Sequence, residues 1–589
     1  MVVGSVPTTI AGDSGVASRT TQSNSGPSTT TLPQKAGAHA MNSPEQIIYP
    51  ARTVRTLDPA RPSAEAVMVR GSRIRAVGSL DELKAYGPSR IDDRYAEAVI
   101  FPGMVEAHAH AGSGGMWENT YVGFYTRKDP DGRIWPGCTS IDEVLDRLRD
   151  ADARLGDGEL LIAWGLDPIF FPGERLDKRH LDSVSTTRPI FVSHQSGHLA
   201  TVNSAMLAHE GIDRDCPVEG VVRGPDGEPN GELREPPAIA LISSASSLLG
   251  GPFDPAALRG FAADARNHGV TTSADLGNPY IMTNALDEHR SIIDDDDFPV
   301  RLSLFHLGGG MGAGGDPDTA SRTLADLAET GSEKMHLGGV KLFLDGSIQG
   351  FTARLQAPGY LSEDGNGIWL SSPEEFYRAF RAYHSAGSVI HVHCNGDEAT
   401  ELFLDTVERV LAEVPRWDHR HTVTHSQLTT PAQYRRMKAL GMCANIFSNH
   451  IWYWGDQHRD VILGPDRAER MNAAATALRI GVPISLHCDT PVTPLDALAT
   501  ASYAAERATP SGRVLGVHER ISVPEALDAV TLGAAYMLKL DHLVGSLESG
   551  KFADFAILDR DPYDCEPAEL RDITVHGSVV AGRHFRAAG

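Results

Sequence analysis

The stretch Phe101-Pro-Gly-Met-Val-Glu-Ala-His-Ala-His110 is the most informative part of the sequence, because it places two histidines, His108 and His110, at the end of a short apolar run. In an extended strand, side chains two residues apart point to the same side. The imidazoles of His108 and His110 can therefore meet one cation. Taken alone, an H-x-H pair fits two solvent-facing loop histidines equally well, so the rest of the chain has to be considered.

Downstream of this stretch, short apolar runs that end in polar residues alternate with helix-like segments. This alternation is typical of buried parallel strands in βα units. In a closed βα barrel the active site lies at the C-terminal ends of the strands, so polar residues there are interpreted first as candidate catalytic or metal-binding residues. The candidate site residues that close such runs are Lys341, His393, His425 and Asp489. The runs are Ile190–His194, Val340–Asp345, Val389–His393, His421–His425 and Ile484–Asp489.

The chain is expected to be an α/β protein, a (β/α)8 TIM barrel with a small β-sandwich domain built from both chain termini. Strand-type runs near both ends assign residues 44–100 and 546–589 to the sandwich and residues 101–545 to the metal-dependent barrel. The segment from about 112 to 250 is too long for one loop and predicts an inserted subdomain that covers the substrate. Residues 1–43, rich in Ser, Thr, Gly and Pro, are predicted to be a disordered leader.

The composition argues against several classes of partner. Among 589 residues, 77 Asp and Glu outnumber 53 Lys and Arg and give a formal charge of -24, which repels nucleic acid and anionic membranes on average. No run approaches the roughly 18 apolar residues of a membrane span. The six cysteines form no C-x-x-C pair, which argues against a disulfide framework or a thiolate zinc ribbon. We therefore expect a soluble, cytoplasmic protein whose partner is a small-molecule substrate, with a homodimer left open.

Five segments in a fixed order resemble the amidohydrolase superfamily, in the branch (amidohydrolase family 3) of YtcJ-like proteins and N-substituted formamide deformylases. They are H-A-H at 108–110, V-K-L-F-L-D-G-S at 340–347, H-C-N-G-D at 393–397, T-H-S-Q at 424–427 and H-C-D-T-P-V at 487–492. The resemblance implies a metal-dependent hydrolase that cleaves a non-peptide C–N bond, of amide, formamide, lactam or carbamate type, in a small molecule with a metal-activated hydroxide. A lyase or isomerase on the same barrel, with Asp489 moving protons, is the alternative. A non-enzymatic metal-binding protein is a third hypothesis, disfavoured by the complete ligand set.

The resemblance also implies which residues bind metal. His108 and His110 would bind one cation and His393 and His425 a second, with Lys341 bridging both as a carbamate. We expect Zn²⁺, one or two ions per chain, because imidazole-rich sites with few carboxylates suit zinc, although other divalent cations stay open. An uncarboxylated Lys341, as a free ammonium or paired with Asp345, is the alternative and would favour a single metal.

Proton transfer and substrate contacts are predicted for a few more side chains. Asp489 is the expected acid/base as well as a metal ligand, since a carboxylate beside an activated water can take its proton and pass it to the leaving nitrogen. His198 is implied by the resemblance to contact the substrate or polarise its carbonyl, with an ordinary turn histidine as the alternative. Aromatic residues predicted to line the pocket, although such residues more often only pack, are Phe351, Trp452, Tyr453 and Trp454.

Two places depart from the pattern of the superfamily. His487 and Cys488 precede Asp489, where Gly-Ser is frequent, so His487 is interpreted as a supporting or strand residue with a ligand role left open. His391 and His393 lie on one strand, and the spacing H-x-x-G-D favours His393 as the ligand.

Overall fold

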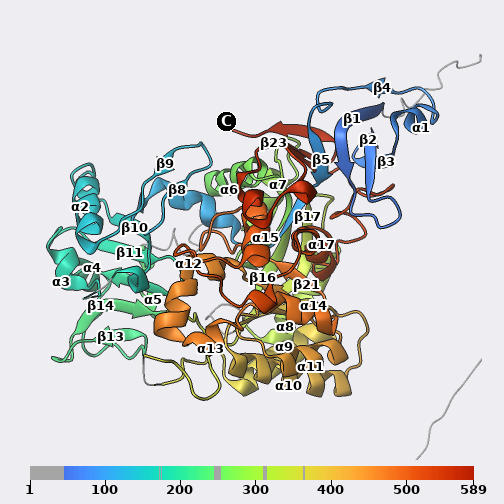
Figure 1. Cartoon of the computed structure of the whole chain (residues 1–589). Coiled ribbons are helices and arrows are strands. Elements are labelled where there is room, and N and C mark those ends of the chain that lie inside the picture. The colour runs from blue at the N-terminus through green and yellow to red at the C-terminus, as the bar shows by residue number, and fades with distance from the viewer. Residues whose placement is uncertain are drawn as a thin grey trace, which may run out of the picture. The chain divides into compact units, whose positions relative to one another are not determined.

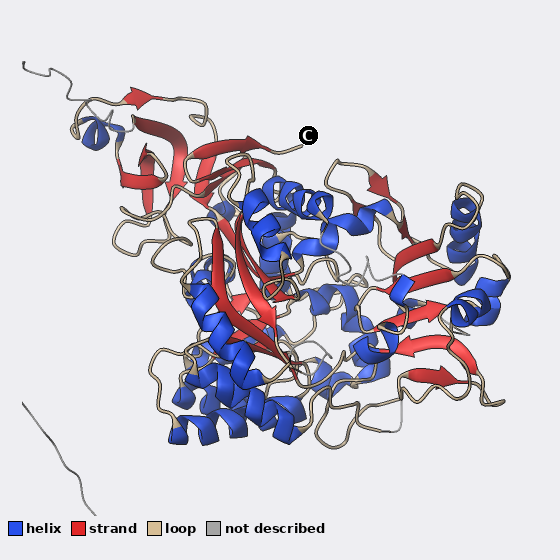
Figure 2. Ribbon diagram, turned by 180° about the vertical axis from the view of Figure 1, so that it is seen from behind, coloured by secondary structure: helices blue, strands red, loops and turns tan. Residues whose placement is uncertain are grey.

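The computed structural model describes residues 45–171, 173, 175–244, 254–309, 315–362 and 365–588. The predicted leader, residues 1–43, lies outside this part of the chain. Strands of the described part form three large sheets and one two-stranded sheet (Figure 2). No helix of the described part is long and apolar enough to cross a membrane.

Eight parallel strands form a nearly closed barrel, which confirms the fold expected from the sequence. The two end strands, β6 and β21, meet next to the candidate site. The Asp489 N–H donates to the His108 carbonyl and the His110 N–H donates to the Thr490 carbonyl, each at 3.0 Å. In order around the barrel the strands are β6 (Met104–Ala109), β15 (Val270–Asn278), β16 (Arg301–Leu307), β17 (Met335–Phe343), β18 (Val389–Cys394), β19 (Thr422–His425), β20 (Cys443–Ile446) and β21 (Ile484–Leu486).

Helices pack on the outside of the barrel and bury one large apolar cluster against it (Figure 1). Local sequence signals fix where several of them begin. Ser372 and Glu375 form a capping box at the start of α9, and Thr430 and Gln433 do the same for α11. These helices are α6 (Pro255–Asn267), α7 (Ala285–Ile293), α8 (Pro317–Ala328), α9 (Pro373–Ser385), α10 (Asp397–Glu413), α11 (Pro431–Leu440), α12 (Asn449–Gln457), α13 (Pro465–Ala468), α14 (Ala474–Ile480), α15 (Ala497–Glu506), α16 (Val523–Ala529) and α17 (Leu532–Met537).

Strands from both ends of the described chain form a second sheet, seen in Figure 1 where blue strands lie beside red β23. The two parts join where β5 pairs antiparallel with β22. A buried ion pair ties this sheet to the barrel, since Arg301 on β16 lies 2.5 Å from the carboxylate of Asp554. Its elements are β1 (Gln46–Arg55), β2 (Ser63–Arg70), β3 (Arg73–Gly78), α1 (Leu80–Lys84), β4 (Arg90–Ile91), β5 (Val99–Pro102), β22 (Phe555–Leu558), β23 (Val575–Val580) and β24 (Arg583–Arg586).

A third sheet is inserted between β6 and β15, within the segment where the sequence predicts a subdomain. Its strand order is β13-β14-β12-β11-β10-β7. The run Ile190–His194, which has the apolar character of a barrel strand, is β11 of this sheet, because burial alone does not specify which sheet a strand joins. The elements are β7 (Thr120–Tyr121), β8 (Arg127–Lys128), β9 (Ile134–Trp135), α2 (Ile141–Asp152), β10 (Leu161–Leu166), α3 (Lys178–Asp182), β11 (Ile190–His194), β12 (Leu199–Val202), α4 (Ser204–His209), β13 (Val221–Arg223), β14 (Pro229–Arg234) and α5 (Glu235–Ile239), with β8 and β9 forming the two-stranded sheet.

Candidate metal centre

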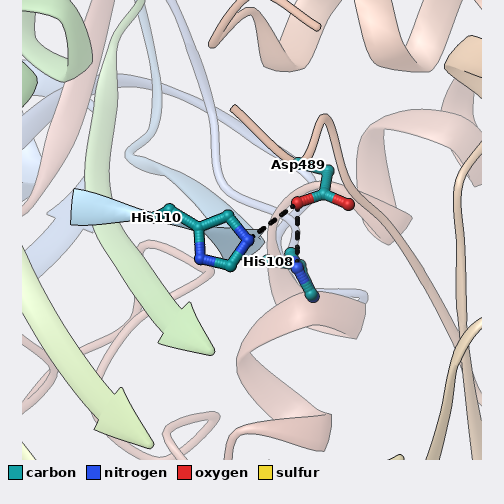
Figure 3. Close-up of side chains that lie close together, drawn as sticks. All are labelled: His108, His110 and Asp489. Atoms are coloured by element: carbon teal, nitrogen blue, oxygen red, sulfur yellow. Dashed lines mark ion pairs between the residues drawn. The ribbon is translucent and has the colours of Figure 1, made fainter. Parts of the chain in front are cut away.

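Three of the predicted ligands meet at the carboxyl end of the barrel, where β6 lies beside the segment that follows β21 (Figure 3). The Nε2 atoms of His108 and His110 lie 2.9 and 3.3 Å from the same carboxylate oxygen, Oδ1 of Asp489. His108 and Asp489 are buried, whereas the His110 side chain keeps 43% of its surface exposed. The cluster is therefore open to solvent on the side of His110.

The backbone at two predicted ligands adopts a left-handed conformation that is unfavourable for residues with a β-carbon. The angle φ is +55° at Asp489 and +75° at His425. Such conformations cost on the order of 1–3 kcal/mol each and persist where the surrounding structure enforces them, often at functional sites. Here the Asp489 N–H donates to the His108 carbonyl, and the His425 carbonyl accepts from the Phe447 N–H. Tertiary hydrogen bonds thus hold both residues in place.

Histidines on β18, on β19 and directly after β21 form the other half of the centre. His393 Nδ1 lies 3.0 Å from His425 Nε2, and His425 Nδ1 lies 3.1 Å from His487 Nε2. His425 Nδ1 is also 3.7 Å from Oδ2 of Asp489, so these histidines are continuous with the cluster around Asp489. His487, His425 and Asp489 themselves form a second group with the spacing of metal ligands.

The fit of these residues to a metal follows from their protonation. Burial lowers the pKa values of His108, His393 and His425 well below the ordinary value, so the imidazoles are neutral and offer lone pairs. Burial alone would raise the pKa of Asp489, but the proximity of His108 and the hydrogen bonds from His108 and His110 outweigh it and hold that pKa well below its usual value. Neutral imidazoles around an ionised carboxylate provide metal-ligand atoms that suit zinc and similar divalent cations.

Lys341 lies at the centre of the same constellation, with its Nζ 3.3 Å from Nδ1 of His108. Its side chain is fully buried, and this burial lowers its pKa to about 7. A substantial fraction of the amine is then neutral near pH 7, which carbamate formation requires. Within the described residues no ion pair joins Lys341 to Asp345. The Asp345 carboxylate instead accepts three backbone N–H groups, those of Arg354, Asn395 and Gly396.

His198 approaches the centre from the inserted sheet, immediately before β12. The centre of its ring lies 5.2 Å from that of His393, and its Nδ1 lies 2.6 Å from Oε2 of Glu235. Burial lowers the pKa of His198, but the charge of Glu235 and its hydrogen bond outweigh burial and raise it. Sequence reasoning missed Glu235, because 37 residues separate the pair and only the pairing of β12 with β14 brings them together.

The predicted pocket aromatics are packed to different degrees. Tyr453 and Trp454 are buried, and the indole N–H of Trp454 donates to the Asp167 carboxylate at 2.9 Å. Trp452 and Phe351 are partly exposed and pack against neighbouring tyrosines. Trp454 therefore has a packing role in this structure, while a pocket-lining role stays a prediction for Phe351 and Trp452.

Other polar side chains on the same strands take different positions. His391 does not join the histidine group and packs on the Phe305 ring, with 4.8 Å between ring centres. Glu106, missed in the sequence, accepts from the N–H of His108 at 2.9 Å and from that of Cys488 at 3.3 Å. Glu106 thus links β6 to the segment that carries Asp489, and the alternation E-A-H-A-H could have identified it.

Comparisons with known proteins agree with this geometry. A model of the amidohydrolase family matches residues 96–585. The chain is 29% identical over 551 residues to the protein LONG AFTER FAR-RED 3 of Arabidopsis thaliana, covering 90% of each chain. It is 25% identical over 539 residues to N-substituted formamide deformylase of Arthrobacter pascens, covering 90% of this chain and 96% of that one. The crystal structure of an uncharacterized metal-dependent hydrolase from Pyrococcus horikoshii OT3 matches with a TM-score of 0.67 at 19% identity, over 89% of this chain and 99% of the other, and so shares the fold.

Proposed function

This chain belongs to the amidohydrolase family, and we propose that it is a metal-dependent hydrolase that cleaves a non-peptide C–N bond of amide, formamide, lactam or carbamate type in a small molecule. One observation carries the proposal. The buried carboxylate of Asp489 lies 2.9 and 3.3 Å from two histidines at the carboxyl end of the barrel, and one of them, His110, keeps 43% of its side chain exposed. The similarity to an N-substituted formamide deformylase supports the class of bond.

The ligands are assigned to two cation positions. His108 and His110 would hold one cation with Asp489, and His393 and His425 would hold the second. Lys341, as a carbamate, would bridge them, which its burial and lowered pKa support. We expect Zn²⁺ at both positions. When bound, such a cation lowers the pKa of a water molecule to about 7 and so supplies hydroxide at neutral pH.

Asp489 is assigned the role of general base and acid. Its carboxylate lies 2.9 and 3.3 Å from the Nε2 atoms of His108 and His110, and its lowered pKa keeps it ionised, which is the form that can accept a proton. The carboxylate takes a proton from the attacking water and returns it to the leaving nitrogen as the C–N bond breaks.

His198 is assigned to the substrate carbonyl. Its Nδ1 is held by Glu235, so the orientation of the ring is fixed and Nε2 is the nitrogen left for the substrate. A donor at this position stabilises the negative charge that develops on the carbonyl oxygen during attack. The ring lies 5.2 Å from that of His393, within reach of a substrate bound at the cation positions.

Turnover of a panel of formamides, anilides and lactams in ¹⁸O-labelled water tests the reaction class. Hydrolysis forms a new C–O bond from water, so the carboxylate product is expected to carry solvent oxygen. The Asp489→Asn variant, purified in parallel, is the control for contaminating activity. Turnover without ¹⁸O in the product would contradict hydrolysis and indicate a lyase or isomerase in which Asp489 moves protons.

A further inference from the structure

A chain of hydrogen bonds behind His425 begins at Asn445 on β20. The amide nitrogen of Asn445 lies 3.2 Å from the Ala107 carbonyl oxygen, and its amide oxygen Oδ1 accepts from the Ser485 hydroxyl at 2.7 Å. Because a backbone carbonyl oxygen can only accept, the amide nitrogen has to face Ala107. Oδ1 of Asn445 is therefore a fixed acceptor that faces β21.

His487 continues this chain. Its Nδ1 lies 2.9 Å from Oδ1 of Asn445, so Nδ1 carries the hydrogen and donates. In a neutral imidazole the other nitrogen is then the acceptor. His487 Nε2 lies 3.1 Å from Nδ1 of His425, which consequently donates to it. The lone pair of His425 is thereby confined to its Nε2.

This lone pair is directed at His393, whose Nδ1 lies 3.0 Å from Nε2 of His425. Nε2 of His393 lies 3.2 Å from the Gly346 carbonyl oxygen and 3.0 Å from the amide nitrogen of Asn395, which also donates to that carbonyl at 2.8 Å. The amide group has two hydrogens, so it can donate both to the carbonyl and to Nε2 of His393, which leaves the His393 hydrogen on Nδ1, facing the His425 lone pair. A cation that takes the place of this hydrogen would be attracted by both nitrogens.

We propose that His487 is a positioning residue for the metal centre. By accepting from Nδ1 of His425 it keeps the Nε2 lone pair directed at His393, and so prepares the second cation position before metal arrives. Asn445 fixes His487 in the tautomer that this task requires. The inference rests on the metal centre of the proposed function and adds to it two residues that are not ligands.

Direct ligation by His487 is the competing role, since His487, His425 and Asp489 also have the spacing of metal ligands. That role would require Nδ1 of His425 to bind the cation and lose its hydrogen. The hydrogen bond between His425 and His487 would then be absent, and Nε2 of His425 would no longer serve the position shared with His393. The two roles therefore predict different effects of substituting His487.

Zinc titration in competition with a chromophoric chelator measures the zinc affinity of both cation positions. The full-length protein is first stripped of metal and supplied with bicarbonate. His487→Gln keeps an acceptor for His425 and a donor for Asn445, whereas His487→Leu has neither. His391→Leu is the matched control, because it removes another buried barrel histidine that takes no part in this chain of hydrogen bonds. Asn445→Ala, which removes the anchor instead, is a second variant should His487→Leu fail to fold.

The wild type is expected to bind two zinc ions. His487→Leu and Asn445→Ala are expected to bind the second ion about 10- to 100-fold more weakly, the usual effect of removing a hydrogen-bond partner of a metal ligand. In these two variants the affinity for the first ion should stay within about threefold of the wild-type value. In His487→Gln and in the His391→Leu control, the affinities for both ions should stay within about threefold of the wild type, well below that effect.

Several results would overturn the positioning role. These are equal second-site affinity in His487→Leu and the wild type, an equal loss in His391→Leu, or a wild type that binds only one zinc. A loss in His487→Gln as large as that in His487→Leu would indicate direct ligation instead. A wild type that binds no zinc at all would refute the proposed function itself, so the two failures are distinguishable.

Discussion

Replacing Glu235 tests whether His198 acts on the substrate from a fixed orientation. The two side chains are largely buried, and their polar atoms lie 2.6 Å apart, a short distance that fits a charge-assisted hydrogen bond. Glu235→Ala leaves the imidazole N–H without this acceptor and loses a hydrogen bond to a charged group, which contributes about 1.5–3 kcal/mol. At about 1.4 kcal/mol per tenfold change in rate, kcat/KM is expected to fall about 10- to 150-fold.

The assay is kcat/KM for the best substrate of the panel, measured together with zinc content. Glu235→Gln keeps an acceptor oxygen and is expected to lose less than about tenfold, because only the charge is removed. Zinc content is expected to match the wild type in both variants, since Glu235 bonds to His198 rather than to a predicted ligand. Glu232→Gln is the matched control, because Glu232, on β14 three residues before Glu235, is also a buried carboxylate but pairs with Arg175 and Arg234. Wild-type kcat/KM in Glu235→Ala, or an equal loss in Glu232→Gln, would refute the reasoning.

Three further predictions concern the metal ligands and the fold. His108→Ala is expected to lower both zinc content and activity, and normal zinc content by elemental analysis would disprove the ligand assignment. Lys341→Ala is expected to lose activity and to regain part of it with short carboxylic acids that occupy the vacated bridge, whereas full activity without them would exclude a bridging role. Burial would lower the pKa of His268 at the end of α6, but the hydrogen bond and charge of Asp264 outweigh it and raise that pKa to about 9. A raised folded-state pKa stabilises the protein at pH values below the unfolded-state pKa of about 6.5, and this stabilisation is lost as the pH rises towards 9. The melting temperature of the wild type should therefore fall more than that of His268→Gln across this window. Equal falls would contradict the assignment.

The barrel could be predicted from the sequence because several of its strands are apolar runs closed by a polar residue. The strands β17, β18, β19 and β21 have this pattern and carry Lys341, His393 and His425, with Asp489 following β21. By contrast, β15 reads V-T-T-S-A-D-L-G-N and β16 reads R-L-S-L-F-H-L, so polar residues interrupt the apolar signal and neither strand stands out. Their place in the barrel is set by pairing with β6 and β17, which the sequence does not display.

The parts of the site that the sequence did not predict depend on contacts between distant segments. Glu235 becomes the partner of His198 only because β14 folds back on β12. Asn445 acquires its place through β20, and its role depends on a carbonyl of β6 that is 338 residues away in the sequence. Trp454 shows the opposite case, since an aromatic residue expected in a pocket fills the protein interior and pairs with Asp167. Residue type and spacing identify candidate ligands, whereas the residues that orient them are defined by tertiary structure.

Asp489→Asn is the most direct test of the central claim that a positioned carboxylate moves the proton in metal-dependent hydrolysis. The amide keeps the size and one oxygen of the side chain but cannot accept a proton as the carboxylate does. Zinc content and melting temperature are expected to stay close to those of the wild type, while kcat falls about 100- to 10,000-fold, the range for loss of a general acid/base. A fall in kcat of less than about fivefold with zinc still bound would lie far outside that range and contradict the claim.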